Sequence, residues 1–216
     1  MLDNVKSKYI VKEIFENIKN KRKLKIIKYN KKIKNKLDIN KEDFEMYITL
    51  KEFNNKYKKN IEDIDIKKLK LNRGNIGNEG LKDLVKINFN KLEEINLSWN
   101  KISDINILEK INFKDLKKLN LGFNNISDIR VLKKVKFEKL EKLNLCCNKI
   151  SDINILEKVN FKELKELNIG GNKISDIKVL EKVKFEKLKV LDLSWNKIDR
   201  NKYSSIVFIL FIIRKK

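Results

Sequence analysis

The chain has 216 residues, enough for one or two domains with a continuous apolar core, so folding requires neither metals nor disulfides. It contains 52 Lys and Arg, 30 Asp and Glu and no His, which gives a formal net charge of +22. The absence of His excludes imidazole general bases, Ser-His-Asp triads and His-ligated zinc.

Residues 1 to 60 carry 18 Lys and Arg against 8 Asp and Glu, with apolar residues at helical spacing. This pattern predicts two or three short helices, and a further helix over residues 39 to 60 that joins this region to the repeats. Residues 8 to 38 resemble an F-box, the helical module that docks a substrate-recruiting protein on the adaptor of a cullin-type ubiquitin ligase. The resemblance implies adaptor contacts by Ile10, Ile14, Phe15, Leu24 and Ile27. A helical cap over the first repeat would show the same periodicity, so both interpretations stay open.

Residues 61 to 199 contain a unit that repeats every 24 residues, preceded by a divergent unit, residues 66 to 91, that is two residues longer. The regular units begin at Leu92, Leu116, Leu140, Leu164 and Leu188. Each unit reads L-x-x-[LI]-x-[LI]-x-x-N-x-I, and the alternating apolar residues predict a half-buried strand. The apolar positions that follow, such as Ile102, Ile105 and Leu108, suit a short helix on an outer layer.

This pattern resembles the leucine-rich-repeat consensus, and the S-D-I-x-x-L stretch is similar to the short-repeat subclass of phosphatase regulators and bacterial internalins. The predicted fold class is therefore α/β: a leucine-rich-repeat solenoid with a concave parallel β-sheet and short outer helices. The small helical region of residues 1 to 60 precedes it. We expect residues 200 to 216 to be an apolar cap or tail.

Two polar positions recur in the same place in the units. The first is an Asn column, which we assign to structure because a buried amide must have its hydrogen bonds satisfied: Asn100, Asn124, Asn148, Asn172 and Asn196. The second is a Ser-Asp pair, such as Ser103 and Asp104, which we expect to cap the backbone N–H groups of the outer segment.

The residues between the strand leucines face the concave side and form rows across the units. Two rows are polar and supply the expected partner-binding residues Lys118, Lys142, Asn96, Asn120, Asn144, Asn168 and Asp192. A third row is small, and a fourth places Trp99, Phe123 and Trp195 around Cys147 and Gly171, a shallow trough with aromatic walls. In the alternative, Trp99 and Trp195 fold over the sheet edge and cover the core.

Two further segments indicate where in the cell the protein is located. The apolar run from Ile206 to Ile213 would rise only about 12 Å as a helix, too short to span a bilayer. It either caps the last repeat or makes a weak membrane contact. The adjacent Cys146 and Cys147 offer no disulfide framework, which favours a reducing intracellular compartment, cytoplasmic or nuclear.

Together these patterns predict a monomeric protein-interaction scaffold without catalysis or cofactor. Its partner is a protein or peptide on the concave face, and an F-box-type role would add a cullin-ligase adaptor. The alternatives are a phosphatase-regulator-like subunit, or binding of RNA or an anionic surface through the basic N-terminal region. Nucleic acid is less favoured, because the concave rows hold five basic residues against three acidic ones.

Overall fold

The computed structural model describes residues 41–61, 66–89, 91–111 and 113–199. Within them, six strands of three residues form one parallel sheet in sequence order. The strands β1 to β6 are Lys68–Lys70, Glu94–Asn96, Lys118–Asn120, Lys142–Asn144, Glu166–Asn168 and Val190–Asp192. From β2 onward, residues one unit apart pair in register, as Ile95 does with Leu119. The predicted α/β solenoid is thereby confirmed.

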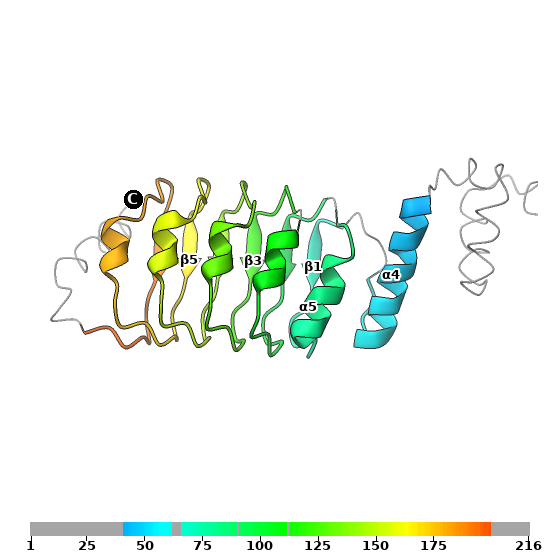
Figure 1. Ribbon diagram of the computed structural model, residues 1–216, viewed down its shortest axis with the longest axis horizontal. Coiled ribbons are helices and arrows are strands. Elements are labelled where there is room, and N and C mark those ends of the chain that lie inside the picture. Colours follow the sequence, from blue (N-terminus) through cyan, green and yellow to red (C-terminus); the bar gives the residue numbers. More distant parts are fainter. Residues whose placement is uncertain (1–40, 62–65, 90, 112, 200–216) are drawn as a thin grey trace, which may run out of the picture.

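A second layer of short helices covers one side of this sheet (Figure 1). These helices are α5 (Gly77–Val85), η2 (Asn106–Lys110), η3 (Arg130–Lys133), η4 (Asn154–Lys158) and η5 (Lys178–Glu181). The predicted outer helices are thus present, but η2 to η5 are 3-10 helices. Of the apolar positions that predicted an outer helix, Leu108 lies in η2, whereas Ile102 and Ile105 precede it, and all three are buried. The α-helix α5 lies in the first unit, where two extra residues lengthen the connection.

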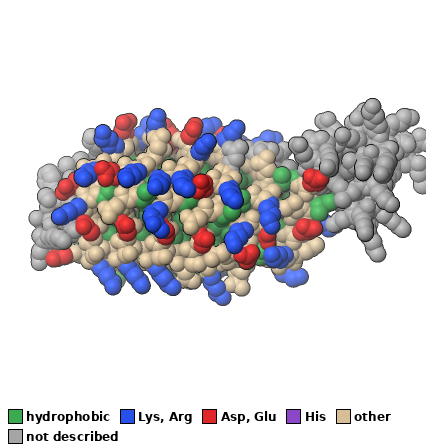
Figure 2. All heavy atoms as spheres, viewed as in Figure 1, with side chains coloured by type: hydrophobic (Ala, Val, Ile, Leu, Met, Phe, Trp, Pro, Cys, Tyr) green, Lys and Arg blue, Asp and Glu red, His purple; other side chains and the backbone are tan. Residues whose placement is uncertain are grey.

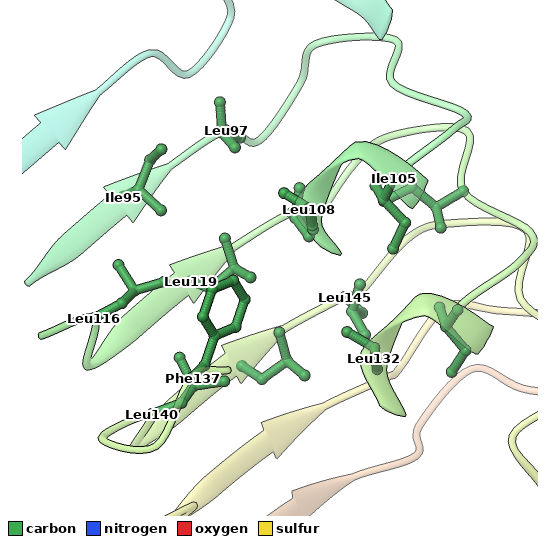
Figure 3. Packing of buried hydrophobic residues seen from close by; sticks show 14 of the residues in the cluster. Ile95, Leu97, Ile105, Leu108, Leu116, Leu119, Leu132, Phe137, Leu140 and Leu145 are labelled. Atoms are coloured by element: carbon green, nitrogen blue, oxygen red, sulfur yellow. The ribbon is translucent and has the colours of Figure 1, made fainter. Parts of the chain in front are cut away.

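Apolar side chains from both layers fill the space between them. Strand residues such as Ile95 and Leu119 belong to the same buried cluster as Leu108 and Leu132 of the outer helices (Figure 3). Phe137, from the loop that leads into β4, packs among them, and it belongs to a row of buried phenylalanines, Phe89, Phe113, Phe137 and Phe161. Since each unit buries its apolar residues against its neighbours, the core is continuous along the stack.

The Asn column has the structural role predicted for it. Asn124 is 7% exposed, and its Nδ2 donates to the backbone oxygens of Leu97, Leu121 and Gly122 at 2.9–3.1 Å. Its Oδ1 accepts the backbone N–H groups of Asn100 and Ile102, both at 3.0 Å. One amide therefore satisfies buried backbone groups of two successive units. Asn100, Asn148, Asn172 and Asn196 bond similarly.

The aspartates of the Ser-Asp pairs cap the outer turns, as expected. Their Oδ1 atoms accept the backbone N–H two residues ahead at 2.8–2.9 Å, in Asp104, Asp128, Asp152 and Asp176. Ser103 instead accepts a hydrogen bond from Nδ2 of Asn78 in the first unit. The carboxylates thus have a local structural role.

Helix α4 (Lys41–Tyr57) confirms the helix predicted over residues 39 to 60 and covers the first unit. Its Leu50 and Phe53 are each 2% exposed, and the Tyr57 hydroxyl donates to Oδ2 of Asp83 in α5 at 2.8 Å. Burial raises the pKa of Asp83, but hydrogen bonds from Lys56, Lys86 and Tyr57 outweigh it and hold the pKa below its usual range. The F-box-like segment, residues 8–38, and the apolar tail, 206–213, lie outside the described residues.

Replacing Asn124 with Ala should lower the free energy of unfolding by about 3 kcal/mol, measured by urea denaturation. The change strands several buried backbone N–H and C=O groups, and each unsatisfied group costs about 1–3 kcal/mol. The matched control is Asn125→Ala, because Asn125 is exposed and, among the described residues, its side chain makes no hydrogen bond while its backbone N–H does. That control should change stability by less than about 0.5 kcal/mol. Equal losses in the two variants would contradict a structural Asn column.

Candidate binding surface on the sheet

The solvent-facing side of β1 to β6, here called the sheet face, carries the predicted rows. Strand register places the first-row and second-row residues side by side on neighbouring strands. The first row is Lys68, Glu94, Lys118, Lys142, Glu166 and Val190; the second is Lys70, Asn96, Asn120, Asn144, Asn168 and Asp192. The strand ends continue into the third row, Asn72, Ser98, Gly122, Cys146, Gly170 and Ser194, and the fourth, Arg73, Trp99, Phe123, Cys147, Gly171 and Trp195.

Charges of the first row are largely paired with one another. Nζ of Lys118 lies 2.6 Å from Oε1 of Glu94, and Nζ of Lys142 lies 2.6 Å from Oε1 of Glu166. Lys68 approaches the same Glu94 oxygen at 3.3 Å. The hydrogen bond to Glu94 raises the pKa of Lys118, so this ammonium stays charged within its pair. Lys118 and Lys142 therefore have carboxylate partners already, which reduces their attraction for an anionic ligand.

The second row offers hydrogen-bond donors. Each Asn uses Oδ1 to accept the backbone N–H two residues ahead, as Asn120 does from Gly122 and Asn144 from Cys146. The same bond forms at Asn96 and Asn168, and Asp192 makes it with Ser194. Because an N–H needs an oxygen acceptor, this bond fixes the orientation of the amide. Within the described residues no hydrogen bond is seen from the amino groups of Asn96, Asn120 and Asn168, so they are free to donate to a ligand, whereas the side chain of Asn144 also hydrogen-bonds the Cys146 thiol.

The fourth row has a left-handed backbone conformation throughout. Its φ angles are 54° at Arg73, 60° at Trp99, 55° at Phe123, 53° at Cys147, 66° at Gly171 and 57° at Trp195. A residue with a Cβ in this conformation costs about 1–2 kcal/mol relative to a right-handed one. The sequence prediction missed this feature, although Gly171 at one of the equivalent positions was a signal for it.

Aromatic side chains of this row point into solvent. Trp99 is 49% exposed, Phe123 40% and Trp195 90%. The rings of Trp99 and Phe123 stack with centroids 4.1 Å apart and planes 8° apart, and the Arg73 guanidinium lies 5.8 Å from the Trp99 ring centre. These exposures contradict the alternative in which Trp99 and Trp195 cover the core. The three aromatic residues are surface side chains.

Small residues line the third row and part of the fourth. A Cβ on Gly122 would lie 3.0 Å from Sγ of Cys146, and one on Gly171 would lie 3.0 Å from Sγ of Cys147. Both cysteines are free thiols. Burial, and then the neighbouring Cys147, raise the pKa of Cys146 to about 11, so its thiol is protonated at neutral pH. A protonated thiol is a poor nucleophile, which argues against cysteine chemistry at this position.

A ladder of ion pairs joins successive units at the edge of the sheet where the strands begin, here called the strand-start edge. Its pairs have N···O distances of 2.6–3.1 Å: Lys67–Glu93, Lys117–Glu93, Lys165–Glu141, Lys139–Asp115 and Lys187–Glu163. The sequence signal was a charge that changes sign from one unit to the next, as in Asp115, Lys139, Glu163 and Lys187. Hydrogen bonds from Lys117 and Lys67 lower the pKa of Glu93 to about 2.

Other kinds of site are not seen in the described ranges. No group of three or more Cys, Asp or Glu side chains there has the proximity needed to hold a metal ion. Nor does any helix in those ranges combine the length and apolarity required to cross a lipid bilayer. The sheet face therefore remains the strongest candidate for a functional surface.

Comparisons with known proteins agree with the repeat pattern. A family model described as leucine-rich repeats in two copies matches residues 114–158 and 138–182. A single leucine-rich-repeat model matches residues 64–85, 90–105 and 186–200. These matches confirm the repeats. A search of curated proteins by sequence found no match.

Solved structures with a similar chain path include two internalins of Listeria monocytogenes. The internalin inlF is 31% identical, with a TM-score of 0.46, over 55% of this chain and 32% of its own. The internalin inlC2 is 24% identical, also at 0.46, over 55% and 48%. The Arabidopsis receptor kinase HAESA, solved with the peptide hormone IDA and a co-receptor, is 25% identical at 0.42, over 59% and 20%. This chain spans less than half the length of each.

Acid should destabilise the fold, because the folded pKa of Glu93 is about 2 and its ordinary value is 4.5. Between these values the unfolded chain binds more protons, so the stabilisation is full above about pH 4.5 and is lost as pH falls toward about 2. Thermal unfolding followed by circular dichroism between about pH 7 and pH 2.5 should show a smaller decline for Glu93→Gln than for the wild type. Glu138→Gln, at an exposed residue without an ion pair in the described region, should behave like the wild type. Identical profiles for all three proteins would contradict the ion-pair ladder.

Proposed function

We propose that this chain, a protein built of leucine-rich repeats, binds a protein or peptide on its sheet face and has no catalytic role. Trp99, Phe123 and Trp195 are the apolar anchors, and Asn96, Asn120, Asn144 and Asn168 donate hydrogen bonds. Leucine-rich-repeat domains are protein-interaction scaffolds, and stacked repeats present an extended surface for this purpose.

One observation carries this proposal. Among the described residues, the large hydrophobic side chains that are exposed are Trp99, Phe123, Val190 and Trp195, and all four belong to rows of the sheet face. The outer helices bury their large apolar side chains at least partly. Exposed aromatic residues gathered on one face are typical of protein interfaces, where Trp is strongly enriched among the residues that dominate affinity.

Backbone strain supports the same interpretation. Trp99, Phe123 and Trp195 occupy a left-handed conformation in which Gly171 is accommodated without strain. Trp195 recovers little of this cost through burial, since it is 90% exposed, whereas Trp99 and Phe123 recover part of it by stacking on each other. Strained residues that gain little from the fold are frequent at functional surfaces. We infer that a partner supplies the missing contacts.

The double variant Trp99→Ala plus Phe123→Ala should lose binding, by roughly thirty-fold if each ring contributes as a typical interface anchor. The measurement is a pull-down from cell extract with quantitative mass spectrometry, followed by titration of the recovered partner. Lys133→Ala plus Glu157→Ala is the control, because both residues are exposed on the outer helices η3 and η4. An unchanged partner list in the aromatic variant would refute the proposed anchors.

We also propose that residues 8–38, which the structure does not describe, dock a cullin-ligase adaptor while the repeats select the recruited protein. Helix α4 favours this role over that of a cap. The first unit is already covered by Leu50 and Phe53 of α4, and Tyr57 and Lys56 bind Asp83 of α5. The end of the solenoid therefore has a cap without residues 8–38. The apolar residues Ile10, Ile14, Phe15, Leu24 and Ile27 are then candidates for a partner contact.

Replacing Ile14 and Phe15 with Asp should abolish co-purification with the adaptor and leave the thermal midpoint of the repeats unchanged. If residues 8–38 instead stabilise the first unit, the same change should lower the midpoint. Both quantities are measured on the full chain, by co-purification from cells that express the adaptor and by circular dichroism. Lys12→Ala plus Lys19→Ala is the control for a polar change in the same segment. A lower midpoint with adaptor binding retained would contradict the adaptor proposal.

A further inference from the structure

Lysines without ion pairs line the edge of the sheet where the strands end. The basic row comprises Lys101, Lys149, Lys173 and Lys197, each two residues after a residue of the fourth row. Asn125 occupies the equivalent place in one unit, and its backbone N–H donates to the oxygen of Ile102 in the preceding unit at 2.7 Å. The backbone N–H groups of Lys149, Lys173 and Lys197 make the same bond at 2.8 Å. Each unit therefore places one residue of this row at the same position on the edge. All four lysines are exposed.

The lysines at the two edges of the sheet differ in whether they form ion pairs. At the strand-start edge, Lys117, Lys139 and Lys187 each have a carboxylate within 2.6–2.8 Å. Within the described residues, the lysines of the basic row have no carboxylate within ion-pair distance. Figure 2 shows basic side chains projecting along the lower edge, with few acidic ones among them; in Figure 1 the chain that follows β6 runs along this edge. The basic row therefore offers exposed ammonium groups next to the fourth row, whereas Asp104, Asp128, Asp152 and Asp176 of the same connections already accept backbone N–H groups of their own turns.

We propose that the partner segment bound at the sheet face is acidic and carries an apolar side chain, which enters the space between Phe123 and Trp195. This inference rests on the proposed function of the sheet face and specifies the chemistry of its ligand. The unpaired ammonium groups of the basic row attract carboxylates, and the exposed rings of Trp99, Phe123 and Trp195 accept the apolar side chain. The Asn amino groups of the second row donate to carbonyl or carboxylate oxygens.

Dimensions fit an extended peptide. Phe123 and Trp195 are three units apart, about 14 Å at a strand spacing of about 4.8 Å, with only Cys147 and Gly171 between them in the row. Lys101 and Lys197 are four units apart, about 19 Å, which an extended chain of about six residues covers. Acidic residues on either side of a central apolar residue would therefore meet the basic row.

A peptide fits this surface better than a nucleic acid does. Trp99 and Phe123 stack on each other at 4.1 Å, which closes one face of each ring to a base. Glu94, Glu166 and Asp192 lie on the same sheet face, and a phosphate at every nucleotide would approach these carboxylates. A peptide carries carboxylates only where its sequence has Asp or Glu, so its acidic residues need not lie near Glu94, Glu166 or Asp192.

The test is selection of random peptides of about ten residues, displayed on phage, on the immobilised full chain at low salt. Acidic sequences with a central aromatic or aliphatic residue should be enriched, and their affinity, measured by fluorescence polarisation, should fall as salt rises. The variant Lys149→Glu, Lys173→Glu and Lys197→Glu should weaken the selected peptides about ten-fold or more. Peptides whose acidic residues are changed to Lys should bind this variant better than they bind the wild type.

The matched control makes the same change in net charge on the outer layer, with Lys110→Glu, Lys158→Glu and Lys182→Glu at three exposed positions. It should bind within about two-fold of the wild type. Enrichment of peptides that are not acidic, or equal weakening in both triple variants, would overturn the inference. The proposed function would still stand if Trp99→Ala plus Phe123→Ala weakens binding as expected above. Unchanged binding in that aromatic double variant would refute the proposed function itself.

Tighter binding of a labelled uridine oligonucleotide than of any selected peptide would overturn the acidic-peptide inference in favour of nucleic acid.

Discussion

The fold depends on one interaction, the hydrogen bonds that each buried Asn makes to two successive units. The carboxamide of Asn124 satisfies backbone oxygens of its own turn and of the preceding one, and it accepts N–H groups from that preceding turn. Asn100, Asn124, Asn148 and Asn172 are 0% to 8% exposed, so water cannot replace these bonds. Every unit is therefore held in the same register as the last, and the rows of the sheet face exist only because that register is kept.

The register also determines where the large positive charge of the chain is neutralised. Lysines at the strand-start edge meet carboxylates of the neighbouring unit because the sign alternates from one unit to the next, as in Lys117 and Glu93. Exposed ion pairs contribute little stability one by one, but alternation of sign replaces repulsion between stacked lysines with attraction. In the part of the chain that the structure describes, the lysines of the basic row lack such partners, so unpaired positive charge lies beside Trp99, Phe123 and Trp195. Overall composition therefore says little about the charge that a partner meets.

The left-handed turn at the end of each strand connects the fold to the candidate function. The turn places its residue outside the core, so a bulky ring there stays in solvent at a cost in backbone strain. The same position accepts Cys147 and Gly171, which shows that the fold does not require an aromatic residue. Trp99 and Phe123 gain a mutual stacking contact, whereas Trp195 stays 90% exposed. Variation at this one position alters the binding surface without altering the repeat.

The sequence by itself determined the number and phase of the units, the strand residues and the structural role of the Asn column, because each of these follows from periodicity and from the need to pair a buried amide. It also placed Lys118, Asn120 and Phe123 correctly on the sheet face. Only the tertiary structure decided which charges are paired, since Lys118 and Lys149 look alike until the neighbouring units are stacked. The tertiary structure was also needed to show three further features: the 3-10 form of the outer turns, the left-handed φ of Trp99 and the covering of the first unit by α4. These features arise from contacts between residues about 24 positions apart or more, or from backbone angles that a residue's identity does not specify.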